Sequence, residues 1–376
     1  MEKKKLLFVY YKLFKPGGIN RVLTNLVNEL AEEYDITILL LMAEHKPFYP
    51  LDERIKLEFI DTFNHWGFRV INQNLRKYLP NLPKRQNIQN YIYDYGVKAM
   101  LDDWYSINHH RFDAIVTCMY KLSIQASSNS KINQKTIAWE HTDHNVVGVL
   151  YKNFRNRNYK NLKSIISINS KSFEFYQKLN SNSSFIPNII GEPFESQVFN
   201  HTKENLMTYV GRLDRDKNVI ELLEIFKASE LTADWKLQII GDGPERRNLE
   251  NFVRENDLEK SIIFYGFKTT EEIVELLQKS KIFVFTSLKE AFALVLVEAI
   301  FCGNALIAYD CNFSPADIIN EKNGFLIPLH DKVEFQKKLQ YLIDNPDRLK
   351  QLAESSFNES KKWKKENLFQ KWKEIL

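Results

Sequence analysis

The chain has little cysteine and no long hydrophobic run. None of its three cysteines lies in a Cys-x-x-Cys pair: Cys118, Cys302 and Cys311. This pattern provides neither a disulfide framework nor a cysteine-based zinc site, and it predicts a reduced, cytoplasmic protein. The longest uncharged apolar run, residues 36–43, is far shorter than the ~20 residues that cross a bilayer. The apolar stretch 6–11 is likewise too short for the core of a secretory signal peptide.

An excess of one charge is also missing from the chain as a whole, but the charge is unevenly distributed. The 52 Lys and Arg residues against 48 Asp and Glu residues give a net charge of +4. Residues 1–190 contain 26 basic and 17 acidic residues, whereas the remainder contains 26 and 31. A basic first half and an acidic second half indicate two domains with different partners. An anionic membrane surface would attract the first half. Nucleic acid is not an expected partner, because no arginine-rich helix or RNA-binding aromatic motif is present.

The first half of the chain has the pattern of a parallel α/β sheet. A composition of 44% hydrophobic and 27% charged residues is that of a globular protein, and 376 residues predict two domains at ~100–200 residues each. Short apolar runs alternate with amphipathic stretches, and a helix is expected directly after Gly17-Gly18. The strands predicted in this half are 5–10, 36–42, 55–60, 114–118, 135–139 and 164–168.

The same pattern starts again after Pro187-Asn188. Two successive doubly wound domains are therefore predicted, 1–187 and 188–359. A lysine-rich amphipathic helix, 360–376, is expected to pack back on the first domain through its aromatic stripe, with a membrane surface as the other interpretation. The strands predicted in the second domain are 207–210, 236–240, 262–265, 282–285, 305–309 and 325–327.

Two cofactor motifs are absent. Neither half has Gly-x-Gly-x-x-Gly after its first strand, which disfavours a nicotinamide-dependent dehydrogenase. No Asp-x-Asp motif stands in a loop suited to bridging a cation and a diphosphate. The sequence therefore predicts no cofactor and no metal site.

The loops after the predicted strands of the second domain carry charged residues and glycines. Ligands of doubly wound folds bind beyond the carboxyl ends of the strands, so these loops are the first place to look for a site. Gly211 follows the strand 207–210, and the planar fork of Arg212 with the point charge of Lys217 suits a diphosphate. A solvated charged loop is the alternative. A second turn, beginning at Gly241, would allow close approach of the backbone.

Two glutamates lie eight residues apart after the strand 282–285. Glu290 is expected in the loop at a helix start, and Glu298 about two turns along the same helix face. The residues between them are all apolar, which predicts a buried helix whose two carboxylates hydrogen-bond two hydroxyl-bearing parts of one ligand. A capping glutamate and a surface glutamate are the alternative interpretation.

The order of these motifs resembles the retaining glycosyltransferases of the GT-B fold, family 4. The motifs are Gly-Arg-Leu…Lys at 211–217, Gly-Asp-Gly-Pro-Glu at 241–245, Tyr-Gly-Phe at 265–267, Glu-x7-Glu at 290–298 and Ala-x-x-x-Gly at 299–303. The resemblance implies two Rossmann-like domains facing each other across a cleft, the first on the acceptor side and the second binding the donor. It also implies transfer of a sugar from a nucleotide-diphosphate sugar, a UDP-sugar in the first place, to an oligosaccharide or lipid-linked acceptor. Capsule, exopolysaccharide or lipopolysaccharide would be the product.

The resemblance assigns a role to single residues. It places Arg212 and Lys217 at the donor diphosphate, Glu290 at the sugar hydroxyls and Glu298 at the ribose. His141 is preferred to His144 as the histidine that faces the donor sugar, because it lies closer to the end of its strand. The predicted catalytic residues are His141, Arg212, Lys217 and Glu290. The predicted donor-binding residues are Gly17, Gly18, Gly211, Arg212, Lys217, Gly241, Phe267, Glu290, Ala291, Phe292, Ala293, Leu294 and Glu298.

The chain departs from this family at two alanines. The family commonly has Glu-Gly-Phe-Gly where this chain has Glu290-Ala291-Phe292-Ala293. The two added methyl groups would reshape the sugar pocket, or block it if these positions need a positive φ. A non-catalytic GT-B subunit that binds a sugar or a partner is therefore the second hypothesis beside the enzyme.

One segment of the first domain is strongly basic. Residues 62–93 contain five basic residues and no acidic residue, with aromatic residues between them. We expect this segment to hold the protein peripherally on the inner, anionic face of the cell membrane. A groove for a negatively charged glycan and a solvated helical face are the alternatives. The residues concerned are Arg69, Arg76, Lys77, Lys84 and Arg85, with Trp66, Phe68, Tyr78 and Tyr91.

Overall fold

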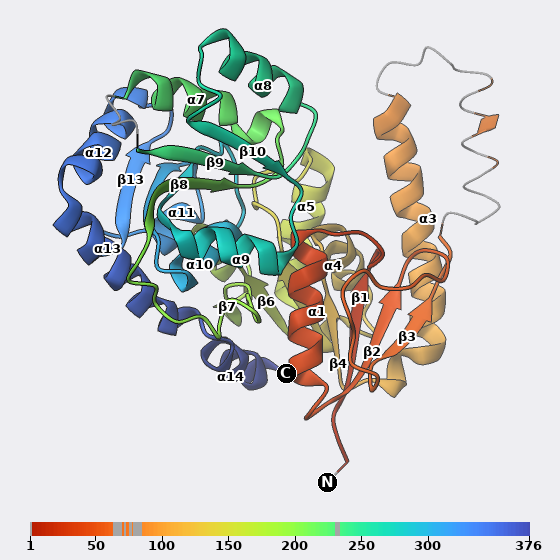
Figure 1. Cartoon of the computed structure of the whole chain (residues 1–376). Coiled ribbons are helices and arrows are strands. Elements are labelled where there is room, and N and C mark those ends of the chain that lie inside the picture. The colour runs from red at the N-terminus through yellow and green to blue at the C-terminus, as the bar shows by residue number, and fades with distance from the viewer. Residues whose placement is uncertain (1, 63–69, 71–72, 75–76, 78–84, 230–233) are drawn as a thin grey trace. The chain divides into compact units, whose positions relative to one another are not determined.

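A computed structural model of the chain divides into two compact units (Figure 1). The N-terminal unit contains residues 1–186 and 371–376, and the C-terminal unit contains residues 187–370. Much of the predicted membrane segment 62–93 lies outside the described residues. The structure describes the whole chain except residues 1, 63–69, 71–72, 75–76, 78–84 and 230–233.

Seven parallel strands form the sheet of the N-terminal unit, in the order β3-β2-β1-β4-β5-β6-β7. The central strands are almost entirely buried, as expected of strands that are covered by helices on both faces. The strands are β1 (Lys5–Tyr10), β2 (Asp35–Leu40), β3 (Lys56–Phe59), β4 (Ala114–Thr117), β5 (Thr136–Glu140), β6 (Ser164–Ser167) and β7 (Ser183–Phe185). The helices include α1 (Gly18–Leu30), α3 (Arg85–Asn108), α4 (Tyr120–Ser127), α5 (Val149–Asn158) and α6 (Ser170–Gln177).

The last residues of the chain complete the N-terminal unit. Trp372 is buried, and its ring lies edge-on to the ring of Trp139 with the centroids 4.9 Å apart. Lys163 Nζ donates a hydrogen bond to the carbonyl oxygen of Leu376 at 3.3 Å. The C-terminal segment forms two helical pieces whose tryptophans are buried, but only residues 371–376 belong to the N-terminal unit, whereas residues 360–370 belong to the C-terminal unit. The pieces are η5 (Ser360–Trp363) and α14 (Lys365–Ile375).

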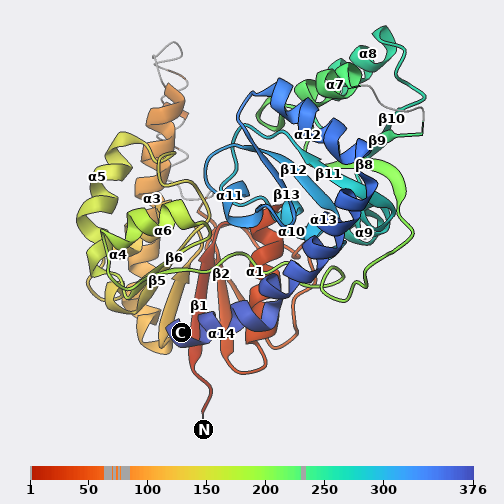
Figure 2. The same cartoon turned by 90° about the vertical axis from the view of Figure 1, so that its left-hand side faces the viewer.

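Six parallel strands form the sheet of the C-terminal unit, in the order β10-β9-β8-β11-β12-β13. Helices α7, α8 and α12 gather on one side of this sheet and α9 and α10 on the other (Figure 2). The strands are β8 (Glu204–Val210), β9 (Lys236–Ile240), β10 (Ile262–Gly266), β11 (Ser280–Phe285), β12 (Ala305–Asp310) and β13 (Gly324–Pro328). The helices are α7 (Val219–Ala228), α8 (Arg246–Glu255), α9 (Thr270–Lys279), α10 (Leu294–Phe301), α11 (Pro315–Ile318), α12 (Lys332–Asp344) and α13 (Pro346–Glu359).

The predicted fold class is confirmed, because both units are doubly wound parallel sheets with alternating helices. Every predicted strand is present, and the strand ends differ by at most three residues. The edge strand β7 was not predicted, since its sequence, Ser-Ser-Phe, is short and mostly polar. No helix in the described part of the chain is long and apolar enough to span a membrane.

Candidate active site

The sheet of the C-terminal unit has its topological switch point between β8 and β11. The chain proceeds from β8 outward through β9 and β10, and then returns to the other side of β8 to form β11. The loops that leave the carboxyl ends of β8 and β11 therefore start next to each other, at the place where doubly wound sheets bind ligands. Of the predicted residues, Arg212 and Lys217 lie in the first loop and Glu290 lies in the second.

Asp214 organises the loop after β8. Its carboxylate accepts a hydrogen bond from the backbone N–H of Lys217 at 3.2 Å and caps the short 3₁₀ helix η4 (Arg215–Lys217). The guanidinium of Arg212 pairs with the same carboxylate, while its side chain stays 74% exposed. An exposed guanidinium can exchange an aspartate for an anionic ligand, because little packing holds it in place.

Lys217 and Glu290 form an ion pair across the switch point. Their side chains are only 24% and 17% exposed, so water screens this pair less than a surface pair. The two loops are also joined by their backbones: Leu288 N donates to Asp216 O at 2.8 Å. The structure therefore brings together a cation and a carboxylate that are 73 residues apart in the sequence.

Three turns pack against one another at this edge of the sheet. Gly211 N donates to Ile240 O at 3.0 Å, and Gly241 N donates to Gly266 O at 2.8 Å. Gly241 has φ +135°, and a Cβ at this position would lie 1.9 Å from Gly211 O. Only glycine fits there, because both the backbone conformation and the close approach exclude a side chain. The glycine turns thus fix the position of the loop that carries Arg212.

Glu290 lies in the loop before a helix, as predicted, but this helix starts later than expected, so Glu298 lies about one turn into it instead of two. Helix α10 begins at Leu294, so Glu290 lies in the loop before it and only Glu298 is helical. Glu290 forms a parallel bridge with Phe313 instead of a helical turn. The apolar segment between the glutamates is shared between a loop and a short helix. Glu298 is 2% exposed, as expected of a helix that is buried on most sides.

The two alanines of this loop are accommodated without strain. Neither Ala291 nor Ala293 has a positive φ, and Ala293 has φ −83°. The backbone of Ala293 donates a hydrogen bond to Ser314 Oγ at 2.6 Å. The backbone therefore does not require glycine at either position, which removes the strain argument for a blocked site.

The loop after β12 contributes residues that the sequence interpretation missed. Phe313 has φ +79° and pairs with Glu290, while the next residue, Ser314, holds Ala293 as described. Cys311 is buried beside them, and burial together with the charge of Glu290 raises the pKa of its thiol to about 12. The sequence did contain a signal for this loop, because the loop also follows a predicted strand. That strand, β12, lies next to β11 in the sheet.

The other predicted residues of the C-terminal unit lie at separate places. Phe267 follows β10 and is 68% exposed. Phe292 is nearly buried, with its ring centroid 6.0 Å from that of Trp363. Leu294 is half-buried at the start of α10. The structure thus gives Phe267 and Leu294 accessible surface and uses Phe292 mainly for packing.

In the N-terminal unit, a group of buried polar atoms lies at the carboxyl end of β5. His141 is 6% exposed, and its ring centroid lies 4.2 Å from that of Trp139. Burial lowers the pKa of His141 to about 3, so the imidazole is neutral. Glu140 accepts a hydrogen bond from Tyr159 at 2.7 Å, and burial raises the pKa of this carboxyl. Within the described part of the chain, His141 Nε2 and Glu140 Oε2 have no hydrogen-bond partner.

His144 and the Gly17-Gly18 pair complete the predicted residues of this unit. His144 stacks on Phe175 with the ring centroids 4.4 Å apart, and its Nδ1 lies 3.2 Å from Ser172 Oγ. Both glycines are exposed, and Gly18 is the first residue of α1. A Cβ at Gly17 would meet nothing within 4 Å, so local packing does not require glycine there.

A metal site is not evident in the described residues, where no three or more His, Cys, Asp or Glu side chains form a group that could hold an ion. The loop after β8 does contain an Asp-x-Asp pair, Asp214 and Asp216, which the sequence interpretation overlooked, but Asp214 is occupied by Arg212 and by the N–H of Lys217. The expected metal independence stays a prediction.

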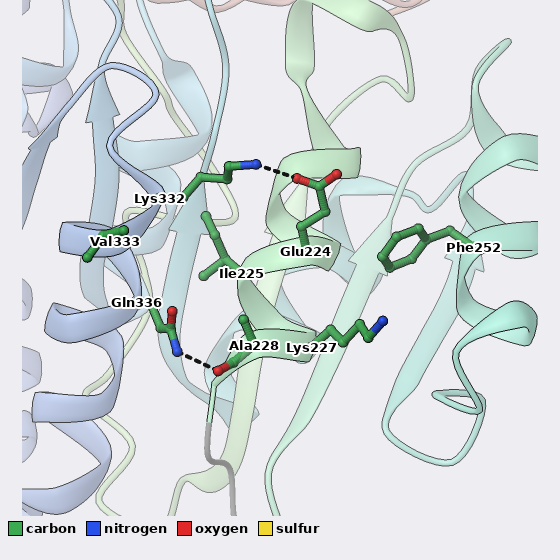
Figure 3. Close-up of a pocket in the computed structure, with 8 residues that line it drawn as sticks. All are labelled: Glu224, Ile225, Lys227, Ala228, Phe252, Lys332, Val333 and Gln336. Carbon is green, nitrogen blue, oxygen red and sulfur yellow. Dashed lines mark hydrogen bonds and ion pairs between the residues drawn. The ribbon is translucent and has the colours of Figure 1, made fainter.

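A pocket of about 560 Å³ lies away from these loops, between α7, α8 and α12 of the C-terminal unit (Figure 3). The Lys332–Glu224 ion pair spans it, with N–O distance 2.8 Å and both side chains about half exposed. Ala228, one of its lining residues, directly precedes Ser229 and the undescribed residues 230–233. None of the predicted site residues lines this pocket.

Residues 192–359 match the model of the family described as Glycosyl transferases group 1. The chain is a glycosyltransferase. The matching segment contains the Lys217–Glu290 pair and all three glycine turns.

Relatives of this glycosyltransferase align over nearly its whole length. It is 25% identical over 386 residues to the amylovoran biosynthesis glycosyltransferase AmsD of Erwinia amylovora, with 99% of each chain covered. It is 22% identical over 382 residues to the Campylobacter jejuni GalNAc-alpha-(1->4)-GalNAc-alpha-(1->3)-diNAcBac-PP-undecaprenol alpha-1,4-N-acetyl-D-galactosaminyltransferase, covering 99% of this chain and 98% of the relative.

Solved structures share the fold. The apo form of the lipopolysaccharide outer core galactosyltransferase WaaB matches with a TM-score of 0.73 at 18% identity, over 99% of this chain and 98% of WaaB. HepE of Anabaena in complex with UDP matches with a TM-score of 0.71 at 16% identity, over 99% and 98%. These likenesses identify the architecture of this glycosyltransferase as GT-B.

Proposed function

We propose that the chain transfers a hexosyl group, with retention of the anomeric configuration, from a UDP-sugar to a lipid-linked or oligosaccharide acceptor in the assembly of a cell-surface polysaccharide. The Lys217–Glu290 pair at the switch point of the C-terminal sheet is the observation that carries this proposal. Names of relatives add support, since AmsD is named for amylovoran biosynthesis and the Campylobacter enzyme for an undecaprenol-linked substrate. The UDP in the HepE structure favours uracil as the base of the donor nucleotide.

The reaction separates a diphosphate anion from the sugar. In the proposed mechanism, the bond between the anomeric carbon and the diphosphate oxygen breaks while the acceptor oxygen attacks from the same face. The acceptor proton passes to the departing phosphate oxygen. Arg212 and Lys217 stabilise the negative charge that develops on the diphosphate, which is the usual role of fixed cations in such transfers.

Glu290 has two functions in this mechanism. It pairs with Lys217 before the donor binds, which keeps the ammonium group at the switch point. When the diphosphate arrives, Lys217 has an anion on each side, and the carboxylate of Glu290 accepts hydrogen bonds from sugar hydroxyls. The contact of His141 with the donor sugar stays a prediction from the resemblance.

A transfer assay tests the proposal. Wild-type protein is first screened by thermal shift against UDP-glucose, UDP-galactose, UDP-N-acetylglucosamine and UDP-N-acetylgalactosamine. The donor that stabilises it is then supplied with polyprenyl-diphosphate oligosaccharides, and the anomeric configuration of the product is read by NMR. A product with the inverted configuration contradicts retention, and the absence of any transfer with any donor supports the non-catalytic subunit instead.

Two variants test the phosphate contacts. We expect Arg212→Ala and Lys217→Ala each to lower the rate of transfer by ~10²-fold, because a charge contact to the leaving diphosphate is lost. The matched control is Lys332→Ala, which removes the Lys332–Glu224 ion pair at the distant pocket (Figure 3) and is expected to leave transfer unchanged. Near-normal turnover in both site variants would refute the assignment.

A further inference from the structure

Helix α5 of the N-terminal unit carries an exposed apolar face that its packing does not use. Val149, Leu150 and Phe154 are 75%, 53% and 56% exposed, and Val146, just before the helix, is 65% exposed. At 3.6 residues per turn, the three helical side chains lie within an arc of ~140°. Single exposed apolar residues are ordinary on a protein surface, but a contiguous group on one face indicates an interaction site.

The opposite face of α5 holds a buried arginine. Arg155 is 2% exposed, its Nη1 donates to the carbonyl oxygen of His144 at 2.7 Å, and its guanidinium lies 4.5 Å from the centre of the Phe175 ring. A surface helix normally buries its apolar residues and exposes its charges. Helix α5 has the reverse arrangement, and the contacts of Arg155 fix it. The apolar face is therefore a feature of the fold and not a result of loose packing.

Two tyrosines of α3 extend this face. The rings of Tyr91 and Tyr151 stack with their centroids 5.5 Å apart, which places α3 beside α5. The hydroxyl of Tyr91 also lies 3.7 Å from the place that a Cβ would take at Gly148, the residue directly before α5. Tyr95, one turn further along α3, is 76% exposed. Tyrosine favours the boundary between water and lipid, because its ring is apolar and its hydroxyl is polar. The α5 surface consists of Tyr91, Tyr95, Val146, Val149, Leu150 and Phe154.

Positive charge borders the α5 surface at the C-terminal end of the helix. Residues 144–173 contain six Lys and Arg residues and no Asp or Glu, and both Arg157 and Lys160 are exposed at the end of α5. The acidic residue of α3 between the two tyrosines, Asp94, is buried and pairs with Lys121 at 2.7 Å. The surface therefore offers an apolar centre with a basic border, the combination that binds interfaces of anionic lipids.

We propose that the α5 surface docks this glycosyltransferase on a membrane containing anionic lipids. The apolar side chains enter the headgroup region, while Arg157 and Lys160 contact lipid phosphates. A second copy of the chain fits less well, since a stable protein interface uses ~20–30 residues on each side and this surface has six apolar or aromatic ones.

Docking has a consequence for the acceptor. The loop that leads into α5 leaves the carboxyl end of β5, where Glu140 and His141 lie. A membrane on the α5 surface thus lies near the edge of the sheet at which doubly wound folds bind ligands. Delivery of a lipid-linked acceptor from the bilayer to this edge rests on the proposed function, whereas the docking itself does not.

Vesicle sedimentation tests the docking. The full chain is mixed with phosphatidylcholine vesicles, with or without 30% phosphatidylglycerol, in about 0.1 M salt. We expect it to pellet with the anionic vesicles only and to be released at about 1 M salt, where the Debye length falls from ~10 Å to ~3 Å. A wild-type chain that stays in the supernatant with anionic vesicles overturns the proposal.

Variants locate the contact. Leu150→Ser with Phe154→Ser is expected to lower the partition coefficient about tenfold or more, because two side chains no longer leave water. Arg157→Gln with Lys160→Gln is expected to lower it roughly fivefold per charge. The control replaces two equally exposed apolar residues elsewhere, Ile107→Ser with Val198→Ser (69% and 79% exposed in the wild type), and is expected to bind as wild type does.

Two further measurements separate the outcomes. Light scattering on size-exclusion chromatography reports the oligomeric state, and a dimer that Phe154→Ser dissociates would assign the surface to a second copy and overturn the proposal. Transfer to a short, soluble acceptor is expected to be unchanged in the Leu150→Ser/Phe154→Ser variant. Vesicle binding by a wild type that transfers no sugar would refute the proposed function and leave the docking intact.

Discussion

Replacing His141 by asparagine tests whether the buried histidine of the N-terminal unit is neutral. His141 is 6% exposed, and burial lowers the pKa of its imidazole from 6.5 to about 3. The unfolded chain takes up a proton near pH 6.5, whereas the folded chain does not do so until the pH approaches 3. Stability from this residue is therefore fully present above pH 6.5 and is lost as the pH falls below that value.

The size of the effect follows from the two pKa values. At pH 5 the solution lies about 1.5 units below the pKa of the unfolded state, and each unit corresponds to about 1.36 kcal/mol. Lowering the pH from 7 to 5 should therefore reduce the free energy of unfolding of the N-terminal unit by about 2 kcal/mol through this histidine. The same pH change in His141→Asn lacks this contribution, since asparagine does not titrate.

Two assays measure this difference. In histidine-labelled protein, the ring resonance that disappears in His141→Asn should stay constant from pH 8 to pH 5, while a histidine-containing model peptide, which titrates near pH 6.5, serves as the control. Urea unfolding at both pH values, followed by tryptophan fluorescence, should show wild type losing about 2 kcal/mol more than the variant. Trp139, whose ring lies 4.2 Å from that of His141, is one of the six tryptophans that contribute to this signal.

A resonance of His141 that titrates with a midpoint near 6.5 would refute the reasoning, as would equal pH dependence of unfolding in both proteins. Either result means that water reaches the imidazole in the folded state. A neutral His141 also has a consequence for catalysis: the pH profile of sugar transfer should show no ionisation near pH 6.5 that His141→Asn abolishes.

Three further outcomes are expected. Gly241→Ala should lower the free energy of unfolding of the C-terminal unit by at least ~2 kcal/mol, because its Cβ would lie 1.9 Å from Gly211 O at φ +135°. Gly17→Ala, which meets nothing within 4 Å, is the control and should unfold in urea as wild type does. In calorimetry, Glu298→Gln should weaken binding of free UDP, whereas Glu290→Gln should weaken binding of the UDP-sugar far more than that of UDP; equal loss of UDP binding in both would contradict the division of roles. Transfer should persist in excess EDTA, and a complete loss that Mg²⁺ or Mn²⁺ restores would contradict metal independence.

The sequence by itself determined the fold class and most of the strands. Short apolar runs such as 5–10 and 236–240 are buried on both faces of a parallel sheet, so the pattern is local, and it predicts both ends of these two strands. The glycine turn at Gly241 was also visible, because a backbone that approaches another backbone closely excludes every side chain. The polar edge strand β7 lacked such a signal.

Only the tertiary structure decided which residues meet. Lys217 and Glu290 are far apart in the sequence, and they pair because β8 and β11 are neighbours in the sheet although two strands separate them along the chain. The orientation of α5 is a second case: periodicity would bury Val149, Leu150 and Phe154, but the contacts of Arg155 with His144 and Phe175 turn those side chains outward. Both features depend on contacts between segments that are apart in the sequence. No local sequence pattern encodes such contacts.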